Sequence, residues 1–259
     1  SLTLLLSFDV LFSQANFNNI VKIVCTTNVN GETEPCGWKK KPLGGLARKA
    51  TIIDNIRAQG FDASIVDAGN LFFAKDKLSP GITTDVAKIN AHTILNAFNE
   101  IGCDAFSPGS QDFALGLSYL RQLEGEAKFP FISTNVTDFS GKKIFDPYII
   151  LNKEGVSIGY IGLISKFSTE EIVVSDVMGS LSQSVKEIRP NCELLVLLFN
   201  GTDQDILKIQ KSDLPIDLIV RSKQKRGSRD GGNKRIPVYS AGDRGKKLYE
   251  LNVSLMSSG

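Results

Sequence analysis

Short apolar runs alternate along the chain with stretches in which apolar residues recur at helical spacing. The runs that predict buried strands are 21–26, 63–68, 104–107, 129–136, 156–164, 193–199 and 216–220. The stretches that predict helices are 46–56, 86–98 and 117–123, with Val86, Ile89, Thr93, Ala97 and Phe98 on one face of the second. Segments 238–241 and 248–253 are expected to close the fold as a β pair. Such alternation is typical of α/β architecture, in which ligands bind at loops leaving the carboxyl ends of strands.

Composition narrows the class of protein. The 259 residues are 42% apolar and 22% charged, which excludes disorder and a polytopic membrane protein and predicts no transmembrane segment. Thirty Lys and Arg residues against 28 Asp and Glu leave a net charge of +2, so nothing in the overall charge favours nucleic acid as a partner. The chain has one histidine, His92, which excludes a site built from several imidazoles. We expect His92 to lie on a helix face without a role in a site.

The first residues predict a processed export signal. An apolar run from Leu2 to Phe12 is followed by Ser13-Gln14-Ala15, whose small first and third residues are typical of a cleavage site. We expect residues 1–15 to be a signal-peptide remnant, residues 16–259 to form a single domain, and the protein to be exported, periplasmic or extracellular. The alternative is an ordinary first strand. The four cysteines form no CxxC pair, and one disulfide of undetermined pairing is possible if the chain is exported.

Five strand-end segments carry a family resemblance. They are 26–31, 66–72, 103–113, 195–201 and 216–225. In order and spacing they resemble the calcineurin-like metallophosphoesterases, and most closely the 5′-nucleotidase branch. The resemblance implies a four-layer α/β/β/α sandwich with mixed sheets and a site in which two divalent metal ions clamp a phosphoryl group. The closing segment 236–245 also fits, and the resemblance extends to about residue 253. Only 254–259 follow, so the branch's C-terminal nucleotide-binding domain is not expected here.

The positions that the resemblance assigns to the metal site depart from the family pattern. They hold Asn28, Asn30, Asn70, Ser110, Gln111, Asn200, Lys223 and Lys225 in place of carboxylates and imidazoles. Neutral amides do not offset the desolvation of a cation, and ammonium groups repel it, so no metal cofactor is expected. This favours a pseudoenzyme that acts as a binding or assembly module. The alternative is a metal-dependent phosphoester hydrolase whose site is rebuilt from Asp67, Asp112, Asp203 and the asparagines.

Basic residues near the last matched segment suggest a ligand. Arg221, Lys223 and Lys225 are candidates for an anion-binding site, and the alternative is a solvated loop. The basic loop 221–235 contains no aromatic residue on which a base could stack, which argues against nucleic acid. The expected partner is therefore an anionic small molecule or another protein.

Overall fold

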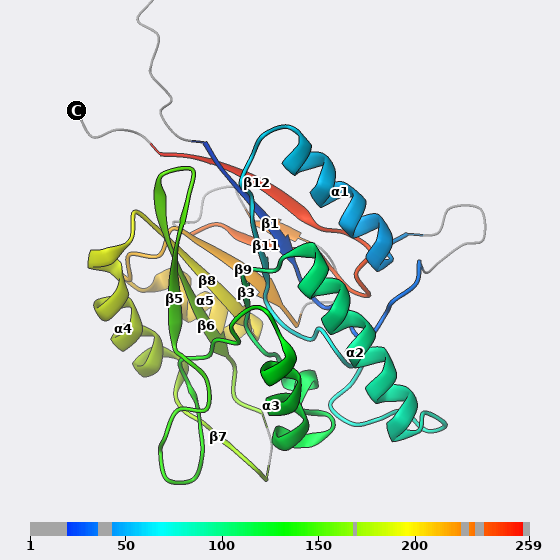
Figure 1. The fold of residues 1–259 in the computed structure, drawn as a ribbon. Coiled ribbons are helices and arrows are strands. Elements are labelled where there is room, and N and C mark those ends of the chain that lie inside the picture. Colours follow the sequence, from blue (N-terminus) through cyan, green and yellow to red (C-terminus); the bar gives the residue numbers. More distant parts are fainter. Residues whose placement is uncertain (1–19, 36–42, 168–169, 224–227, 231–235, 256–259) are drawn as a thin grey trace, which may run out of the picture.

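The computed structural model describes residues 20–35, 43–167, 170–223, 228–230 and 236–255 (Figure 1). The expected signal remnant 1–15, Cys36 and Lys225 lie outside these residues.

The first sheet has four strands in the order β12-β1-β2-β3. Its strands are β1 Ile20–Thr26, β2 Ser64–Asp67, β3 Ala105–Phe106 and β12 Tyr249–Ser254. The first three are parallel, and β12 pairs antiparallel to β1 with Val21 opposite Val253. Three helices pack beside this sheet: α1 Leu46–Ala58, α2 Thr84–Ile101 and α3 Gly116–Glu126 (Figure 1).

The second sheet has six strands in the order β10-β11-β9-β8-β6-β5. They are β5 Tyr148–Lys153, β6 Val156–Ile164, β8 Leu194–Asn200, β9 Leu218–Ser222, β10 Ser228–Asp230 and β11 Val238–Ser240. Strands β6, β8, β9 and β11 are parallel neighbours, so their carboxyl ends share one edge. The remaining elements are α4 Val177–Ile188, α5 Asp203–Lys211, the short pair β4 Val136–Thr137 and β7 Val173–Val174, and the 3₁₀ turns η1 Ser110–Phe113 and η2 Arg189–Asn191.

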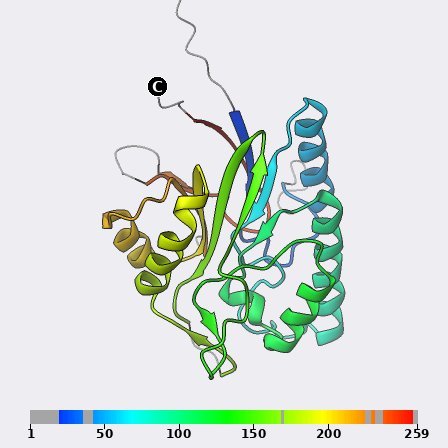
Figure 2. The same cartoon turned by 60° about the vertical axis from the view of Figure 1, so that its left-hand side comes forward.

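The two sheets face each other with helices on both outer sides, as Figure 2 shows. Between the sheets lies a fully buried apolar core that includes Ile23, Val66, Tyr160 and Val196. Separate apolar clusters join the helices to the outer face of each sheet. The predicted four-layer α/β/β/α sandwich with mixed sheets is confirmed.

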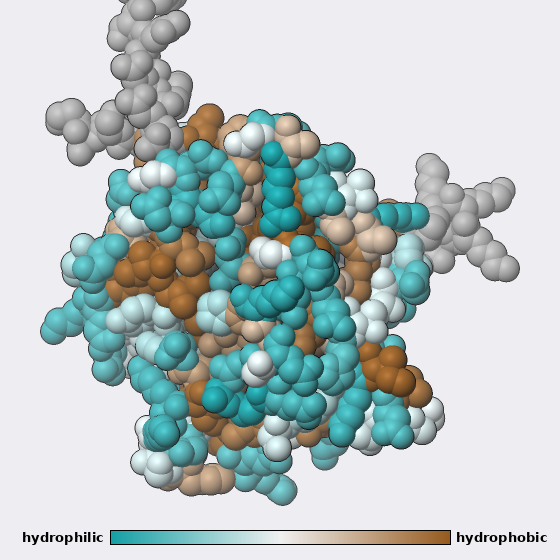
Figure 3. Space-filling view, in the orientation of Figure 1, coloured by the Kyte–Doolittle hydropathy of each residue, from teal (hydrophilic) through white to brown (hydrophobic). Residues whose placement is uncertain are grey.

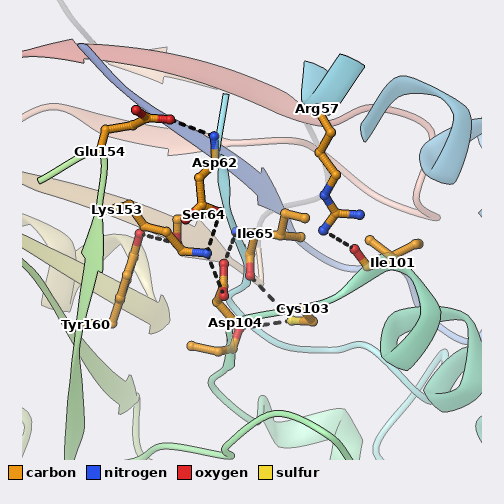
Figure 4. Close-up of polar contacts among 11 residues, drawn as sticks. Arg57, Asp62, Ser64, Ile65, Ile101, Cys103, Asp104, Lys153, Glu154 and Tyr160 are labelled. Atoms are coloured by element: carbon orange, nitrogen blue, oxygen red, sulfur yellow. Dashed lines mark hydrogen bonds and ion pairs between the residues drawn. The ribbon is translucent and has the colours of Figure 1, made fainter. Parts of the chain in front are cut away.

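Polar contacts also join the two sheets, at the end opposite the carboxyl ends of the parallel strands (Figure 4). The Lys153 ammonium on β5 lies 3.0 Å from Asp62 and 3.2 Å from Asp104, both on the first sheet's side. The Tyr160 hydroxyl on β6 donates to Ser64 on β2 at 2.8 Å. Burial lowers the pKa of Lys153, but the hydrogen bonds and charges of Asp62 and Asp104 outweigh burial and raise it above the usual range.

Two predicted elements were wrong. Segment 129–136 is extended but belongs to no ladder over most of its length: Ile132 N–H donates to Phe106 at 2.8 Å, and Thr134 N–H donates to Gly162 at 2.8 Å. The segment thus crosses between the sheets, and Gly162 leaves room for the Ile132 carbonyl. Segments 238–241 and 248–253 do not pair with each other, because β11 joins β9 in one sheet and β12 joins β1 in the other.

The buried face of α2 also differs from the prediction. Val86 is 49% and Ile89 64% exposed, whereas Phe98, on the same predicted face, is buried together with Ala87 and Ala91. The stripe that packs against the core is also apolar and consists of Ala87, Ala91, Ile94, Leu95, Phe98 and Ile101. Apolar colour is correspondingly visible on the surface over α2 in Figure 3. Among the described residues, no helix combines the length and apolar character needed to cross a bilayer.

Candidate functional site

A cavity of about 370 Å³ opens where the strands of both sheets end. Loops after β1, β2, β3 and β9, together with the segment before β12, supply its walls. The residues with predicted site roles that line it are Asn28, Asn30, Asn70, Ser110, Gln111 and Lys223. We call this the strand-end cavity. The structure therefore brings together residues that are up to 195 positions apart in the sequence, as the contact between Asn28 and Lys223 shows.

Buried amides hydrogen-bond to one another beneath the strand-end cavity. Asn70 Nδ2 donates to Asn28 Oδ1 at 3.0 Å, and the Lys223 backbone N–H donates to the same oxygen at 2.9 Å. Asn70 Oδ1 in turn accepts from the Gln111 N–H at 3.3 Å. Asn28 Nδ2 donates to the Gly242 carbonyl at 2.7 Å. The oxygens that could have turned toward a cation thus already accept N–H groups.

Asn200, at the end of β8, is held in the same way. Its Oδ1 accepts from the Ser110 N–H at 3.2 Å, and its Nδ2 donates to Ser222 Oγ at 2.7 Å. Ser222 Oγ donates onward to the Ala68 carbonyl at 2.6 Å, which links the two sheets at their carboxyl ends. Asn200 is fully buried, so each of these bonds satisfies a group that water cannot reach.

Gly109 makes this close approach possible. A Cβ atom at this position would lie 2.6 Å from Asn200 Nδ2 and 2.7 Å from the Asn70 backbone nitrogen. Any side chain would therefore separate the two asparagines. The glycine is required by packing at the site and not by its own backbone conformation.

Left-handed backbone is concentrated around the strand-end cavity. Six non-glycine residues of the described chain have positive φ, and five of them line the cavity: Asn28, Asn30, Asn70, Lys223 and Arg244. Asparagine tolerates this conformation, whereas lysine and arginine do not favour it. Lys223 has φ 70° and Arg244 φ 58°. Strain of this kind persists only where the surrounding structure over-determines the backbone, and it clusters at functional sites.

Asp112 fixes the loops that form the cavity. Its Oδ2 accepts the N–H groups of Asn70 and Gly109 at 2.8 Å each, and its Oδ1 accepts those of Leu71 at 2.8 Å and Phe72 at 2.9 Å. Burial raises the pKa of Asp112 to about 7, although the backbone N–H groups of Phe72 and Gly109 favour its charged form. With both oxygens occupied, this carboxylate is a structural clamp and does not line the cavity.

The other two carboxylates of the rebuilt-site alternative do not reach the cavity either. Asp67 is fully buried and accepts hydrogen bonds from Thr26 Oγ1 and from the Gly69 N–H. Burial raises the pKa of Asp67 to about 6, against the opposing charge of Lys49. Asp203 is exposed and pairs with Arg221 at 2.6 Å. The structure therefore does not bring Asp67, Asp112 and Asp203 together at one site.

The basic candidates separate in space. Arg221 is buried, and besides Asp203 its guanidinium binds the Gly201 carbonyl at 3.0 Å, so it does not line the cavity. The Lys223 side chain does line it, and no carboxylate of the described chain forms an ion pair with its ammonium. Burial lowers the pKa of Lys223, partly offset by the charge of Asp205. Lys225 lies outside the described residues.

Sequence reasoning missed three charged residues of the strand-end cavity. Arg244 pairs with Glu32: its Nε lies 2.7 Å and its Nη2 lies 2.6 Å from Glu32 Oε1. Asp243 lines the same cavity. The resemblance of the closing segment 236–245 to the family was a signal for Asp243 and Arg244. Nothing in the local pattern of the sequence singled out Glu32.

The donor set of the cavity does not fit a pair of divalent cations. The amide oxygens of Asn28, Asn70 and Asn200 accept N–H groups, and Lys223 adds positive charge. Within the described residues, no group of three or more His, Cys, Asp or Glu side chains is placed to hold a metal ion. A tight cation site draws on several carboxylate or imidazole ligands whose lone pairs face the ion.

His92 and the described cysteines lie away from the cavity. His92 sits on α2 with Nδ1 3.1 Å from Glu126 and its ring edge against Tyr119, as expected for a helix-face histidine. Cys25, Cys103 and Cys192 are buried free thiols. No disulfide joins these three, and Cys36 lies outside the described residues.

Comparisons with known proteins place the fold among the phosphoesterases. The structure of the calcineurin-like phosphoesterase YfkN from Bacillus subtilis aligns with a TM-score of 0.73 over 93% of this chain and 87% of that one, at 20% identity. The NAD nucleotidase NadN from Haemophilus influenzae aligns with a TM-score of 0.75 over 93% of this chain and 48% of that one, at 15% identity. The chain therefore has the calcineurin-like phosphoesterase fold.

Sequence similarity points to the 5′-nucleotidase branch of that class. The trifunctional nucleotide phosphoesterase protein YfkN of Bacillus subtilis is 24% identical over 236 residues, which cover 78% of this chain. Protein UshA of Yersinia enterocolitica is 34% identical over 122 residues, 46% of this chain. The matched parts span 16% of the first relative and 21% of the second. No family model matches the chain. The chain thus resembles 5′-nucleotidase-type, calcineurin-like phosphoesterases.

Proposed function

We propose that this chain is a metal-independent binding protein built on a phosphoesterase fold, and that its strand-end cavity binds a small anion without hydrolysing it. One observation carries the proposal: the side-chain oxygens of Asn28, Asn70 and Asn200 all accept N–H groups of the protein. Asn28 Oδ1 accepts two N–H groups and the other two oxygens accept one each, so a metal ion would compete with these bonds and would be buried beside neutral amides.

The ligand chemistry follows from the groups that remain available. The Lys223 ammonium offers strong hydrogen bonds to an oxyanion. The side-chain oxygens of Asn30 and Gln111 are buried and have no hydrogen-bond partner in the described chain. A small rotation of either amide toward the cavity would pair its oxygen with a hydroxyl of the ligand. A small anion that also carries a hydroxyl group, such as hydrogen phosphate, satisfies both requirements.

The overall charge of the strand-end cavity favours a small ligand over a polyanion. Glu32 and Arg244 neutralise each other, and Asp243 balances Lys223. A cavity close to neutral attracts one anionic group held by specific hydrogen bonds, but not the dense charge of a nucleic acid. The same hydrogen bonds to Lys223 would bind one acidic side chain of a protein partner. In that case the chain would act as an assembly module.

The alternative function is metal-dependent phosphoester hydrolysis, the kind of activity named for YfkN. A hydrolysis assay in added Mn²⁺ separates the two: it follows phosphate release from AMP and p-nitrophenol release from bis(p-nitrophenyl) phosphate, with YfkN as the active control. We expect no release above the buffer rate from this chain. In parallel, calorimetric titration of inorganic phosphate in the presence of EDTA should give saturable binding. Metal-dependent turnover, or the absence of phosphate binding, would each contradict the proposal.

We also infer export, on the apolar run and small-residue pattern within 1–15. Expression of the complete precursor in a bacterial host and N-terminal sequencing of the protein recovered outside the cytoplasm provide the test. A new N-terminus near Asn16 is expected. Protein retained inside the cell with its start intact would contradict the inference.

A further inference from the structure

A second cavity of about 260 Å³ lies next to the strand-end cavity. Its lining mixes apolar and polar residues and comes from the loop after β1, from the segment between β2 and α2 and from the first two turns of α2. Leu78, Ile82 and Ala87 form its apolar surface above Phe72 and Phe73. We call it the side cavity. The hydrogen-bonded asparagines of the strand-end cavity do not explain why an apolar surface lies beside them.

The two cavities share part of their walls. Asn30, Glu32 and Ala74 line both. Glu32 is the charged group at this junction, and its ion pair with Arg244 at 2.6 Å neutralises it. A molecule that extends from one cavity into the other therefore passes beside a compensated ion pair, without facing an isolated carboxylate.

The floor of the side cavity is held rigid by the same residue that shapes the strand-end cavity. Asp112 accepts the N–H groups of Leu71 and Phe72 through one oxygen, and of Asn70 and Gly109 through the other. Phe72 and Phe73 are 1% and 4% exposed and pack into the apolar core. The same hydrogen-bonded loop therefore contributes to both cavities, as a site for one extended ligand requires.

The charge around the side cavity suits an anionic ligand. Lys75 and Lys77 stand exposed on its rim, and no acidic residue of the described chain forms an ion pair with either. Asp76, between them, does not line the cavity. With Lys223 in the strand-end cavity, lysines line both cavities.

We propose that the side cavity is the subsite for the apolar body of the ligand whose anionic head occupies the strand-end cavity. The inference rests on the proposed function, and it names the ligand class: an organic phosphate or similar oxyanion ester carrying an aromatic or aliphatic group. The head contacts Lys223, and the body contacts Leu78, Ile82 and Ala87.

Two phosphonates that resist hydrolysis provide the test, in EDTA and by calorimetric titration. Methylphosphonate carries the head alone, and benzylphosphonate adds an apolar body. Removing on the order of 60 Å² of apolar ligand surface from water should make benzylphosphonate bind roughly tenfold more tightly. Benzyl alcohol, which lacks the head, should not bind measurably.

A matched pair of variants tests whether the higher affinity for benzylphosphonate comes from the side cavity. Ile82→Ser removes apolar surface from the cavity wall, and Ile89→Ser makes the same change at a residue of α2 that is 64% exposed and lines neither cavity. We expect Ile82→Ser to weaken benzylphosphonate about threefold while methylphosphonate is unaffected. Ile89→Ser should change neither affinity.

The outcomes separate the inference from the function on which it rests. Equal affinity for the two phosphonates, or equal effects of the two variants, overturns the subsite and leaves the anion site intact. Failure of both phosphonates to bind overturns the proposed function, and the subsite with it.

Discussion

Lys223 offers a direct test of whether the strained cavity is maintained for its side chains. Its φ of 70° lies in the left-handed region, which costs an L-residue about 1–2 kcal/mol. Glycine adopts this conformation freely, but its greater freedom in the unfolded chain offsets about 0.5–1 kcal/mol of the gain. The Lys223 N–H bond to Asn28 is retained in glycine, and no ion pair of the described chain is lost. Lys223→Gly should therefore raise the free energy of unfolding by about 0.5–1 kcal/mol.

The same substitution should weaken anion binding. Loss of a hydrogen bond from an ammonium group corresponds to about 1.5–3 kcal/mol, or a loss of affinity of tenfold or more for inorganic phosphate. Thermal unfolding and calorimetric titration measure the two effects on one sample. For a chain of this size the midpoint should rise by roughly 1–4 °C. Lys223→Ala is the control, because it removes the ammonium but keeps the strained backbone: its affinity should fall equally without the rise in midpoint.

Two results would refute this reasoning. If Lys223→Gly unfolds at a lower temperature than the unaltered chain, the lysine side chain stabilises the fold. The left-handed backbone would then not be a destabilising feature that is retained for ligand binding. If both variants bind phosphate as tightly as the unaltered chain, the ammonium is not part of the site.

Three further perturbations test the surrounding network. Asn28→Asp combined with Asn70→Asp introduces two carboxylates at positions where the family pattern has metal ligands. Because the hydrogen bonds donated by the two side-chain amides are lost, the variant should unfold at a lower temperature in EDTA. Added Mn²⁺ should raise the unfolding midpoint of the variant but not that of the unaltered chain. Asp112→Asn leaves an amide NH₂ against two backbone N–H donors and should lower the free energy of unfolding by about 3–5 kcal/mol in urea titrations, whereas a change below about 1 kcal/mol would contradict the clamp. Lys153→Met leaves Asp104 without its cation and should cost about 2–4 kcal/mol near neutral pH. The pKa of Lys153 is raised in the folded chain. The stability that its charge contributes is therefore fully present below the unfolded pKa of about 10.4 and is lost as the pH rises through the folded pKa. The difference in the free energy of unfolding between the variant and the unaltered chain should accordingly shrink only in strong alkali.

Much of the fold was predictable because its central strands are continuous apolar runs. Strand β6 has the predicted bounds Val156–Ile164, and β1, β2, β8 and α1 lie within a residue or two of their predictions. Helices α4 and α5 were not predicted, although Val177, Leu181, Val185 and Ile188 recur at helical spacing on the buried face of α4. The prediction that 238–241 and 248–253 pair with each other was wrong, because closeness in the sequence does not reveal that the two segments join opposite sheets.

The site was predictable to the extent that it follows strand ends. Asn28, Asn70, Ser110 and Asn200 were placed together by the resemblance, and the structure brings them into one hydrogen-bonded network. The role of Asp112 as a clamp was not predictable, because it depends on four backbone N–H groups converging from two loops. The side cavity likewise depends on how α2 packs, and the apolar face of that helix was misassigned.

Anomalous diffraction from crystals soaked in Mn²⁺ tests the central claim most directly, since it locates the ion itself. The occupied amide oxygens predict no pair of anomalous peaks among Asn28, Asn70 and Asn200. Two peaks about 3.5–4 Å apart at that position would show that the amides rearrange to bind metal, and would contradict the account.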